Sequence, residues 1–262
     1  MQKLNVATMA TAGTWLDTQA PRFVHQLDRH SPGTNKLVLL LIEDTQRCNG
    51  AYIQQEVTKA RKLFDGVKIH MITGGMGRHA NLAYFDMLRA FLPAVFGEPE
   101  LLYMDLDIDT VAPLDGIIDV APEAGLLWLA DPTGMYHVIE ALKICGFKTP
   151  AEGAPILQAG MLYVRGNHYA DLQTLKSKYG STITGKTPVP GTVYWNMLKQ
   201  QHGEHAVQLP REWGTTMWDV ENLTKVRTLH YTGRFDVLRN HVSYNIKSKD
   251  KPPFLESLEI KP

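Results

Sequence analysis

One stretch of this chain organises the interpretation of the rest: Leu101-Leu-Tyr-Met-Asp105-Leu-Asp107-Ile-Asp109-Thr-Val-Ala-Pro113-Leu-Asp115. A short apolar run leads directly into three aspartates at alternate positions. Because alternate residues of a strand lie on one face, Asp105, Asp107 and Asp109 are predicted to start out pointing the same way. Carboxylates crowded at the end of a buried strand repel one another and lose hydration. The pattern predicts a site for a hard divalent cation, or alternatively an acidic turn that is solvated as the chain leaves a sheet.

The sequence before this stretch alternates between strand and helix patterns. The run 36–42 is apolar at every position after Lys36, which is typical of a central parallel strand covered on both faces. Repeated strand–helix alternation predicts right-handed βαβ units, with ligands at the carboxyl ends of the strands. The expected strands cover residues 4–11, 36–42, 67–71 and 101–104, and the expected helices lie around residues 23–27, 53–64 and 80–94.

The second half of the chain is less regular. Apolar runs predict strands over 124–130 and 159–164, and a further strand with a histidine near its end is predicted over 226–232. Short or weak helical patterns predict helices over 137–142, 170–178 and 193–200. Residues 180–192 are rich in Gly, Thr and Pro, and we expect a loop there. The fold class expected from the whole pattern is α/β, with a Rossmann-like, mostly parallel central sheet, helices on both faces and a smaller mixed C-terminal part.

Length, charge balance and cysteine content indicate how many domains to expect, which partners are disfavoured and where the protein is located. The chain has 262 residues, and no linker divides it, so we expect a single domain over 1–245 followed by a polar tail over 246–262. Lys+Arg and Asp+Glu balance at 27 each, which disfavours a protein that binds nucleic acid or anionic membrane through overall charge. Two cysteines, no signal-peptide pattern and no apolar run of membrane-spanning length predict a cytoplasmic location without a transmembrane segment.

Four short motifs occur in an order that resembles a known family. Tyr103-Met-Asp105-Leu-Asp107 is an Asp-x-Asp segment, followed by Pro113-Leu-Asp115. The other three are Arg89-Ala-Phe-Leu-Pro93, Gln158-Ala-Gly-Met161 and His230-Tyr-Thr-Gly233. In this order they resemble motifs of the GT-A-fold glycosyltransferases, in particular the retaining branch that includes glycogenin and bacterial lipopolysaccharide galactosyltransferases.

The resemblance implies a metal site and a donor substrate. It implies that Asp105, Asp107 and His230 hold Mn²⁺, or Mg²⁺, and that the ion binds the diphosphate of a nucleotide sugar, with a UDP-sugar favoured. Two carboxylates and one imidazole suit Mn²⁺ better than Ca²⁺. The alternative for His230 is a histidine hydrogen-bonded in the core. Asp109 is either an outer acceptor or, if the pair is Asp107 and Asp109, the second ligand.

The resemblance also implies residues for donor binding and catalysis. Arg89 would reach a phosphate or a sugar hydroxyl, with a solvated helix face as the alternative. Trp15 would stack on the nucleobase, although an aromatic residue just after a strand is more often part of the core. We interpret Gly74-Gly-Met-Gly77 as a turn, because it lacks the pattern of a phosphate loop. The predicted catalytic residues are Gln158 and Asp131, and the predicted donor-binding residues are Thr11, Gly13, Trp15, Arg89, Asp105, Gly160, Gly233 and Arg234.

Two positions depart from the family pattern. Where the family has an Asp-Gln pair ahead of Leu-Asn, this chain has Gly191-Thr192 ahead of Trp195-Asn196. The lysine of the late His-x-x-Gly-x-x-Lys-Pro-Trp motif falls on Asp236. The group that faces the anomeric carbon is therefore open, with Gln158 as one candidate, and retention is inherited by analogy.

These departures keep other functions under consideration. The first alternative is a non-catalytic protein that binds nucleotide sugars or glycans on the same fold. The second is a phosphatase of the haloacid dehalogenase type, because 107–111 partly resembles its nucleophile loop; the second acidic pair of that class is absent after residue 115. For a transferase, the acceptor stays open among a glycan, a lipid-linked glycan, a protein and a modified DNA base, and so does the oligomeric state.

Overall fold

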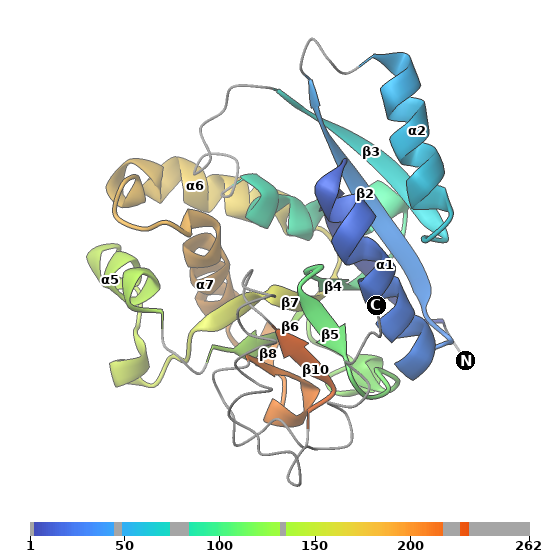
Figure 1. Cartoon of the computed structure of the whole chain (residues 1–262). Coiled ribbons are helices and arrows are strands. Elements are labelled where there is room, and N and C mark those ends of the chain that lie inside the picture. The colour runs from blue at the N-terminus through green and yellow to red at the C-terminus, as the bar shows by residue number, and fades with distance from the viewer. Residues whose placement is uncertain (1–2, 45–48, 74–83, 132–134, 217–225, 231–262) are drawn as a thin grey trace, which may run out of the picture.

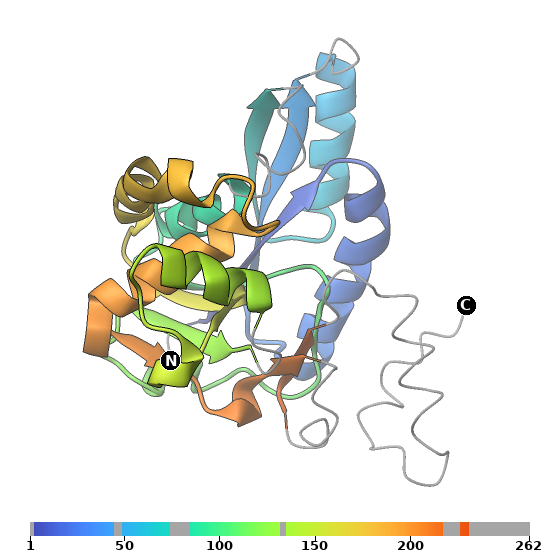
Figure 2. The ribbon, with the colours of Figure 1, turned by 90° about the vertical axis from the view of Figure 1, so that its left-hand side faces the viewer.

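The computed structural model describes residues 3–44, 49–73, 84–131, 135–216 and 226–230. They form a central sheet between two layers of helices, with a second, smaller sheet beside one edge of these layers (Figures 1 and 2). The α/β architecture predicted from the sequence is confirmed. Among the described residues no helix has the length and apolar character needed to cross a membrane.

The central sheet has seven strands in the order β3-β2-β1-β4-β7-β6-β8. Every neighbouring pair is parallel except the two pairs made by β7, so β7 alone runs against the others. The sheet is mostly parallel, as predicted. Its strands are β1 (Asn5–Thr11), β2 (Asn35–Asp44), β3 (Gly66–Thr73), β4 (Glu100–Met104), β6 (Leu126–Ala130), β7 (Leu157–Arg165) and β8 (Ala206–Gln208).

Helices cover both faces of this sheet because its strands are apolar on both sides. In β2, Leu37, Leu39 and Leu41 face one core, and Val38 and Leu40 face the other. The helices α1 and α2 pack against the second of these cores, and α5, α6 and α7 against the first (Figure 2). The α-helices that lie wholly within the described residues are α1 (Thr14–His30), α2 (Gly50–Arg61), α4 (Leu92–Phe96), α5 (Tyr136–Ile144), α6 (Tyr169–Ile183) and α7 (Pro190–His202).

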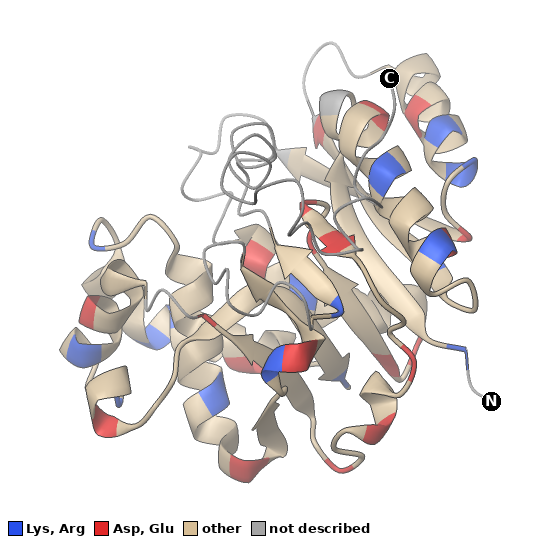
Figure 3. Ribbon diagram, turned by 60° about the horizontal axis from the view of Figure 1, so that its bottom comes forward, with Lys and Arg blue, Asp and Glu red and all other residues tan. Residues whose placement is uncertain are grey.

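Basic and acidic residues are interspersed over the described part of the chain (Figure 3). Both signs occur along α1 and in the second half of α2. This distribution agrees with the balanced overall charge.

The second sheet has the order β5-β10-β9, with β5 antiparallel to β10 and β10 parallel to β9. The sequence patterns did not predict β5, β8 or β9, each of which is only two or three residues long. The strands of this sheet are β5 (Ile108–Thr110), β9 (Thr215–Thr216) and β10 (Thr228–His230).

The loop predicted over 180–192 is wrong at both ends. The helix α6 continues to Ile183, and α7 already begins at Pro190. Proline is favoured in the first turn of a helix, since its missing N–H would have no partner there. The helix predicted over 80–94 is interrupted: residues 84–88 are helical, and a 3₁₀ turn at Arg89–Phe91 precedes α4. The predicted turn at 74–77 and tail at 246–262 lie outside the described residues.

The remaining 3₁₀ helices are short and lie in connections between the larger elements. They are η2 (Ile117–Asp119), η3 (Pro150–Glu152), η4 (Gly203–His205) and η5 (Arg211–Trp213).

Candidate active site

The acidic stretch forms the turn that joins the two sheets. The strand β4 ends at Met104, and the backbone N–H of Asp105 donates to the carbonyl of Gly160 on the antiparallel neighbour β7, at 2.8 Å. The N–H of Ile108 then donates to the carbonyl of Asp105 at 3.1 Å, which closes the turn before β5. Asp105 and Asp107 therefore lie just past the carboxyl end of a central strand, where α/β sheets bind ligands.

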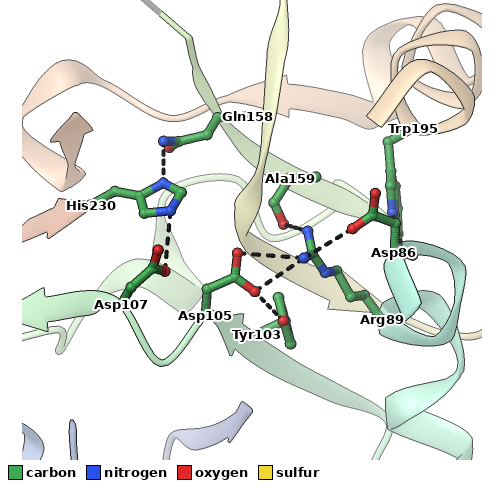
Figure 4. A network of polar contacts seen from close by, with 9 residues as sticks. All are labelled: Asp86, Arg89, Tyr103, Asp105, Asp107, Gln158, Ala159, Trp195 and His230. Atoms are coloured by element: carbon green, nitrogen blue, oxygen red, sulfur yellow. Dashed lines mark hydrogen bonds and ion pairs between the residues drawn. The ribbon is translucent and has the colours of Figure 1, made fainter. Parts of the chain in front are cut away.

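His230, the last residue of β10 in the second sheet, lies next to this turn. It lies opposite Ile108 in the pairing of β10 with β5, and its Nε2 is 3.2 Å from Oδ1 of Asp107. The side-chain amide of Gln158 contacts the other ring nitrogen, Nδ1, at 2.5 Å (Figure 4). Potential ligand atoms of Asp105, Asp107 and His230 all lie within 4.8 Å of one another. The three residues that the resemblance names as metal ligands are thus brought together.

Arg89 holds the other side of Asp105. Its guanidinium Nη2 donates to both carboxylate oxygens of Asp105, at 3.1 and 3.4 Å, and its Nη1 donates to the carbonyl of Ala159 at 2.5 Å (Figure 4). The hydroxyl of Tyr103 also donates to Asp105. Only 11% of the Arg89 side chain is exposed, so the alternative of a solvated helix face is wrong.

The electrostatics of this cluster favour an added cation. Burial raises the pKa of Asp105, and Asp107 raises it further, while Arg89 opposes the shift. Burial lowers the pKa of His230, but its contact with Asp107 outweighs burial, so the net shift is upward. A divalent cation would compensate the crowded carboxylates, and two carboxylates with one imidazole form a donor set that accepts Mn²⁺ or Mg²⁺. The described residues therefore fit a metal site.

Gly160 is the residue that lets these groups approach one another. A Cβ atom built at this position would lie 2.6 Å from Cε1 of His230 and 3.1 Å from Oδ2 of Asp105. Any larger residue would occupy the space between the two potential ligands. The role of Gly160 is therefore to leave room, and its position in Gln158-Ala-Gly160 has a steric reason.

Asp109 does not belong to this cluster, which corrects the expectation that the three aspartates start out pointing the same way. The chain leaves the central sheet after Met104 and turns, so the alternation of a single strand does not extend to residue 109. The side chain of Asp109 is 1% exposed and forms an ion pair with Arg22 of α1. Asp109 serves the packing of α1 on the second sheet.

Asp86 is a site residue that the motifs did not reveal. Its buried carboxylate lies 3.0 Å from Nη2 of Arg89, so one guanidinium lies between Asp86 and Asp105 (Figure 4). A Cβ atom at Gly191 would lie 2.1 Å from the Cβ of Asp86, so the carboxylate occupies space that a side chain at 191 would need. Burial raises the pKa of Asp86 to about 6, although Arg89 opposes the shift. The only available sequence signal was an acid three residues before Arg89.

Asn196, the second residue of the surviving Trp195-Asn196 pair, has a structural position. Its side-chain oxygen accepts from the N–H of Leu157 at 2.7 Å, and its amide donates to the carbonyl of Leu157. These bonds fix the start of β7 against α7, immediately before Gln158. The departure at 191–192 therefore leaves the local framework of the site in place.

The predicted donor-binding residues of the first loop lie at the carboxyl end of β1, the strand next to β4. Thr11 ends β1, and the N–H of Gly13 donates to the carboxylate of the buried Glu56 on α2, at 2.7 Å. Trp15 is 46% exposed, so it is not a core residue. Gly233 and Arg234 lie outside the described residues.

Asp131, the second predicted catalytic residue, follows β6. Its backbone N–H donates to the carbonyl of Ile156 at 2.8 Å, and it lines a pocket of about 270 Å³ together with Arg211 and Gln208. The pairing of Leu129 with Gln158 places this strand end beside the start of β7. Asp131 therefore lies at the carboxyl end of a strand beside β7, but its pocket is lined by none of Asp105, Asp107 and His230, and its catalytic role stays a prediction.

The chain is similar in structure to several solved glycosyltransferases. Mouse xyloside xylosyltransferase 1 matches with a TM-score of 0.56 and 12% identity, over 89% of this chain and 99% of that one. The galactosyltransferase LgtC, solved with donor and acceptor sugar analogues, matches with a TM-score of 0.63 and 12% identity, over 88% of each chain. The glycosyltransferase GlyE of Streptococcus pneumoniae matches with a TM-score of 0.55 and 16% identity, over 89% of this chain and 55% of that one.

Comparisons of sequence find no such relatives: no protein-family model matches the chain, and no curated protein matches it significantly. The structural likeness, at these low identities, shows the fold. This fold is the GT-A fold, as the resemblance of the motifs implied.

Proposed function

We propose that the protein is a glycosyltransferase that binds a nucleoside-diphosphate sugar, with a UDP-sugar favoured, through a divalent cation. The observation that carries this proposal is the meeting of Asp105, Asp107 and His230 at the carboxyl end of β4, on a fold shared with solved glycosyltransferases. When bound, Mn²⁺ or Mg²⁺ would supply Lewis-acid stabilisation of the leaving nucleoside diphosphate.

In this proposal Arg89 binds the donor and keeps the acidic turn in place. Its contacts with Asp86, Asp105 and the Ala159 carbonyl hold its guanidinium in one orientation. A guanidinium held in this way is preorganised to bind phosphate or sugar oxygens with little loss of side-chain entropy.

We assign Asp86 the role of the acid that the family pattern has at the start of α7. The carboxylate at 86 lies against the bare backbone of Gly191, so an acidic group occupies that region although residue 191 has no side chain. Its oxygens would accept a hydrogen bond from a sugar hydroxyl, since a carboxylate is an acceptor with more than one lone pair available.

Gln158 orients His230 in this proposal. The amide nitrogen of Gln158 faces Nδ1 of His230 in the structure. A metal ion on Nε2 of His230 would require a hydrogen on Nδ1, so the Gln158 amide would have to turn over and present its oxygen as the acceptor. Gln158 and Asp131 also stay the predicted catalytic candidates, and retention of configuration stays proposed by analogy. Thr11, Gly13, Trp15, Gly160, Gly233 and Arg234 complete the proposed donor site, with the base and ribose at the first loop.

A thermal-shift titration with UDP-sugars tests the proposal. We expect a rise in melting temperature that needs Mn²⁺ or Mg²⁺, and that Asp107→Ala abolishes together with donor hydrolysis and transfer. Equal stabilisation in EDTA, or wild-type turnover in Asp107→Ala, would refute the metal assignment. Metal-dependent binding without turnover in a donor-by-acceptor mass-spectrometric screen would favour the non-catalytic alternative. Hydrolysis of simple phosphoesters without a response to nucleotide sugars would favour a phosphatase.

A further inference from the structure

A second group of potential metal ligands lies where α6 begins and α7 ends, and none of its residues belongs to the candidate active site. His168 immediately precedes α6, Asp171 lies in the first turn of α6, and His202 is the last residue of α7. The two helices pack against each other. One ligand atom from each of the three residues lies within 4.8 Å of the other two.

The hydrogen bonding of His168 leaves one ring nitrogen available. Its Nε2 lies 3.2 Å from the carbonyl oxygen of Gly125, and a carbonyl can only accept. The hydrogen of a neutral ring is therefore on Nε2, and the lone pair of Nδ1 points toward the cluster. Metal-binding histidines typically donate their other N–H to a carbonyl or a carboxylate in this way.

The three side chains converge without bonding directly to one another. Oδ2 of Asp171 lies 4.0 Å from Nδ1 of His168 and 4.0 Å from Nε2 of His202. The two imidazole rings are nearly perpendicular, with centroids 4.8 Å apart. Separations of 4.0 Å are too long for hydrogen bonds. Ligand atoms of a tetrahedral zinc ion lie roughly 3.3 Å apart. The two 4.0 Å separations from Asp171 would therefore have to shrink by roughly 0.7 Å each, and the separation between the two histidine nitrogens, which is within 4.8 Å, by at most roughly 1.5 Å.

We propose that His168, Asp171 and His202 form a zinc site that links the start of α6 to the end of α7. Two imidazoles and one carboxylate suit Zn²⁺, whereas Mg²⁺ and Ca²⁺ prefer oxygen ligands. The side chain of Asp171 is 55% exposed, which leaves room for ion entry and for a water molecule as the fourth ligand. The site would connect the two helices that cover the sheet beside the active site.

Zinc titration in an Asp107→Ala background tests this proposal separately from the proposed function, because that variant disables the acidic cluster. We expect the variant to bind Zn²⁺, and its melting temperature to rise by roughly 5 °C at about 100 times the dissociation constant. Adding His202→Ala or Asp171→Asn should remove one equivalent of bound zinc and this rise in melting temperature. His137→Ala, which removes an exposed histidine of α5, is the matched control and should change neither.

Cobalt provides a second measurement. Co²⁺ bound in place of zinc should give visible absorption bands that disappear with His168→Ala and with His202→Ala. Unchanged zinc stoichiometry and affinity in the His202→Ala variant would overturn the proposal. His202→Ala is the decisive variant because His202 is partly exposed and its replacement leaves the hydrogen bond from His168 to the Gly125 carbonyl intact.

Discussion

Replacing Gly160 with alanine should weaken Mn²⁺ binding strongly while the chain still folds. The new methyl group would lie 2.6 Å from Cε1 of His230, whereas carbon atoms in contact are about 3.5–4.0 Å apart. The imidazole ring must therefore retreat by roughly 1 Å. Oδ2 of Asp105 would lie 3.1 Å from the methyl group, so this carboxylate oxygen must also move away, by a smaller distance.

The expected magnitude follows from the tolerance of metal coordination. Metal–ligand distances are defined to within about 0.2 Å, so a displacement near 1 Å removes His230 as an effective ligand. We expect Mn²⁺ affinity to fall by at least about 10–100-fold, the range seen when groups supporting a metal ligand are lost. The overpacking itself should cost about 1–3 kcal/mol of unfolding free energy.

Isothermal titration with Mn²⁺, together with urea unfolding, measures both effects. Gly33→Ala is the matched control, because a Cβ atom at Gly33 meets no other atom within 4 Å. Wild-type Mn²⁺ affinity in a folded Gly160→Ala protein would show that Asp105 and His230 do not share an ion across this glycine.

Three further predictions concern groups around the site and its supporting layers. Asp86→Asn should weaken binding of the UDP-sugar by roughly 10- to 150-fold, since a charge-assisted hydrogen bond contributes about 1.5–3 kcal/mol, and should leave the affinity for Mn²⁺ in the absence of donor unchanged; an equal loss of both in titrations would contradict a donor-binding role. Arg22→Met should destabilise the fold by about 3–5 kcal/mol in urea unfolding because it removes the cation that pairs with the buried carboxylate of Asp109, and adding Asp109→Leu should restore most of the loss; no recovery in the double variant would refute this account. Burial lowers the pKa of Lys199 from 10.5 to about 8, so the unfolded chain binds more protons between these values and stability should rise with pH across them; Lys199→Met should flatten that rise in thermal melts, and an unchanged slope would contradict it.

Asp105 and Asp107 of the acidic turn have a different role from Asp109, although the three residues are close in the sequence. Asp105 and Asp107 face Arg89 and His230 at the junction of the two sheets. Asp109, two residues further on, anchors α1 through Arg22. The ion pair between Arg22 and Asp109 holds β5 against α1, and β5 directly follows the acidic turn. Loss of this ion pair should therefore lower the stability of the fold around the turn, without removing any of the potential metal ligands.

Much of the central framework could be predicted from local patterns alone. The apolar runs of β1, β2 and β4 and the helical spacing between them are properties of neighbouring residues, and they predict parallel strands with ligands at the carboxyl ends. Asp105 and Asp107 follow from the same logic, because a carboxylate directly after a buried strand must lie at that edge. The motif order then led to Arg89, Gly160 and His230.

Contacts between distant segments could not be read from such patterns. The direction of Asp109 depends on where the chain turns into a second sheet of very short strands, and its partner comes from α1. Asp86 belongs to the site because helix packing brings it against Gly191, where the absence of a side chain creates the space. His168 and His202 meet only because α6 and α7 pack together. Periodicity determines which face a residue occupies, but the packing of whole elements determines which side chains share a site.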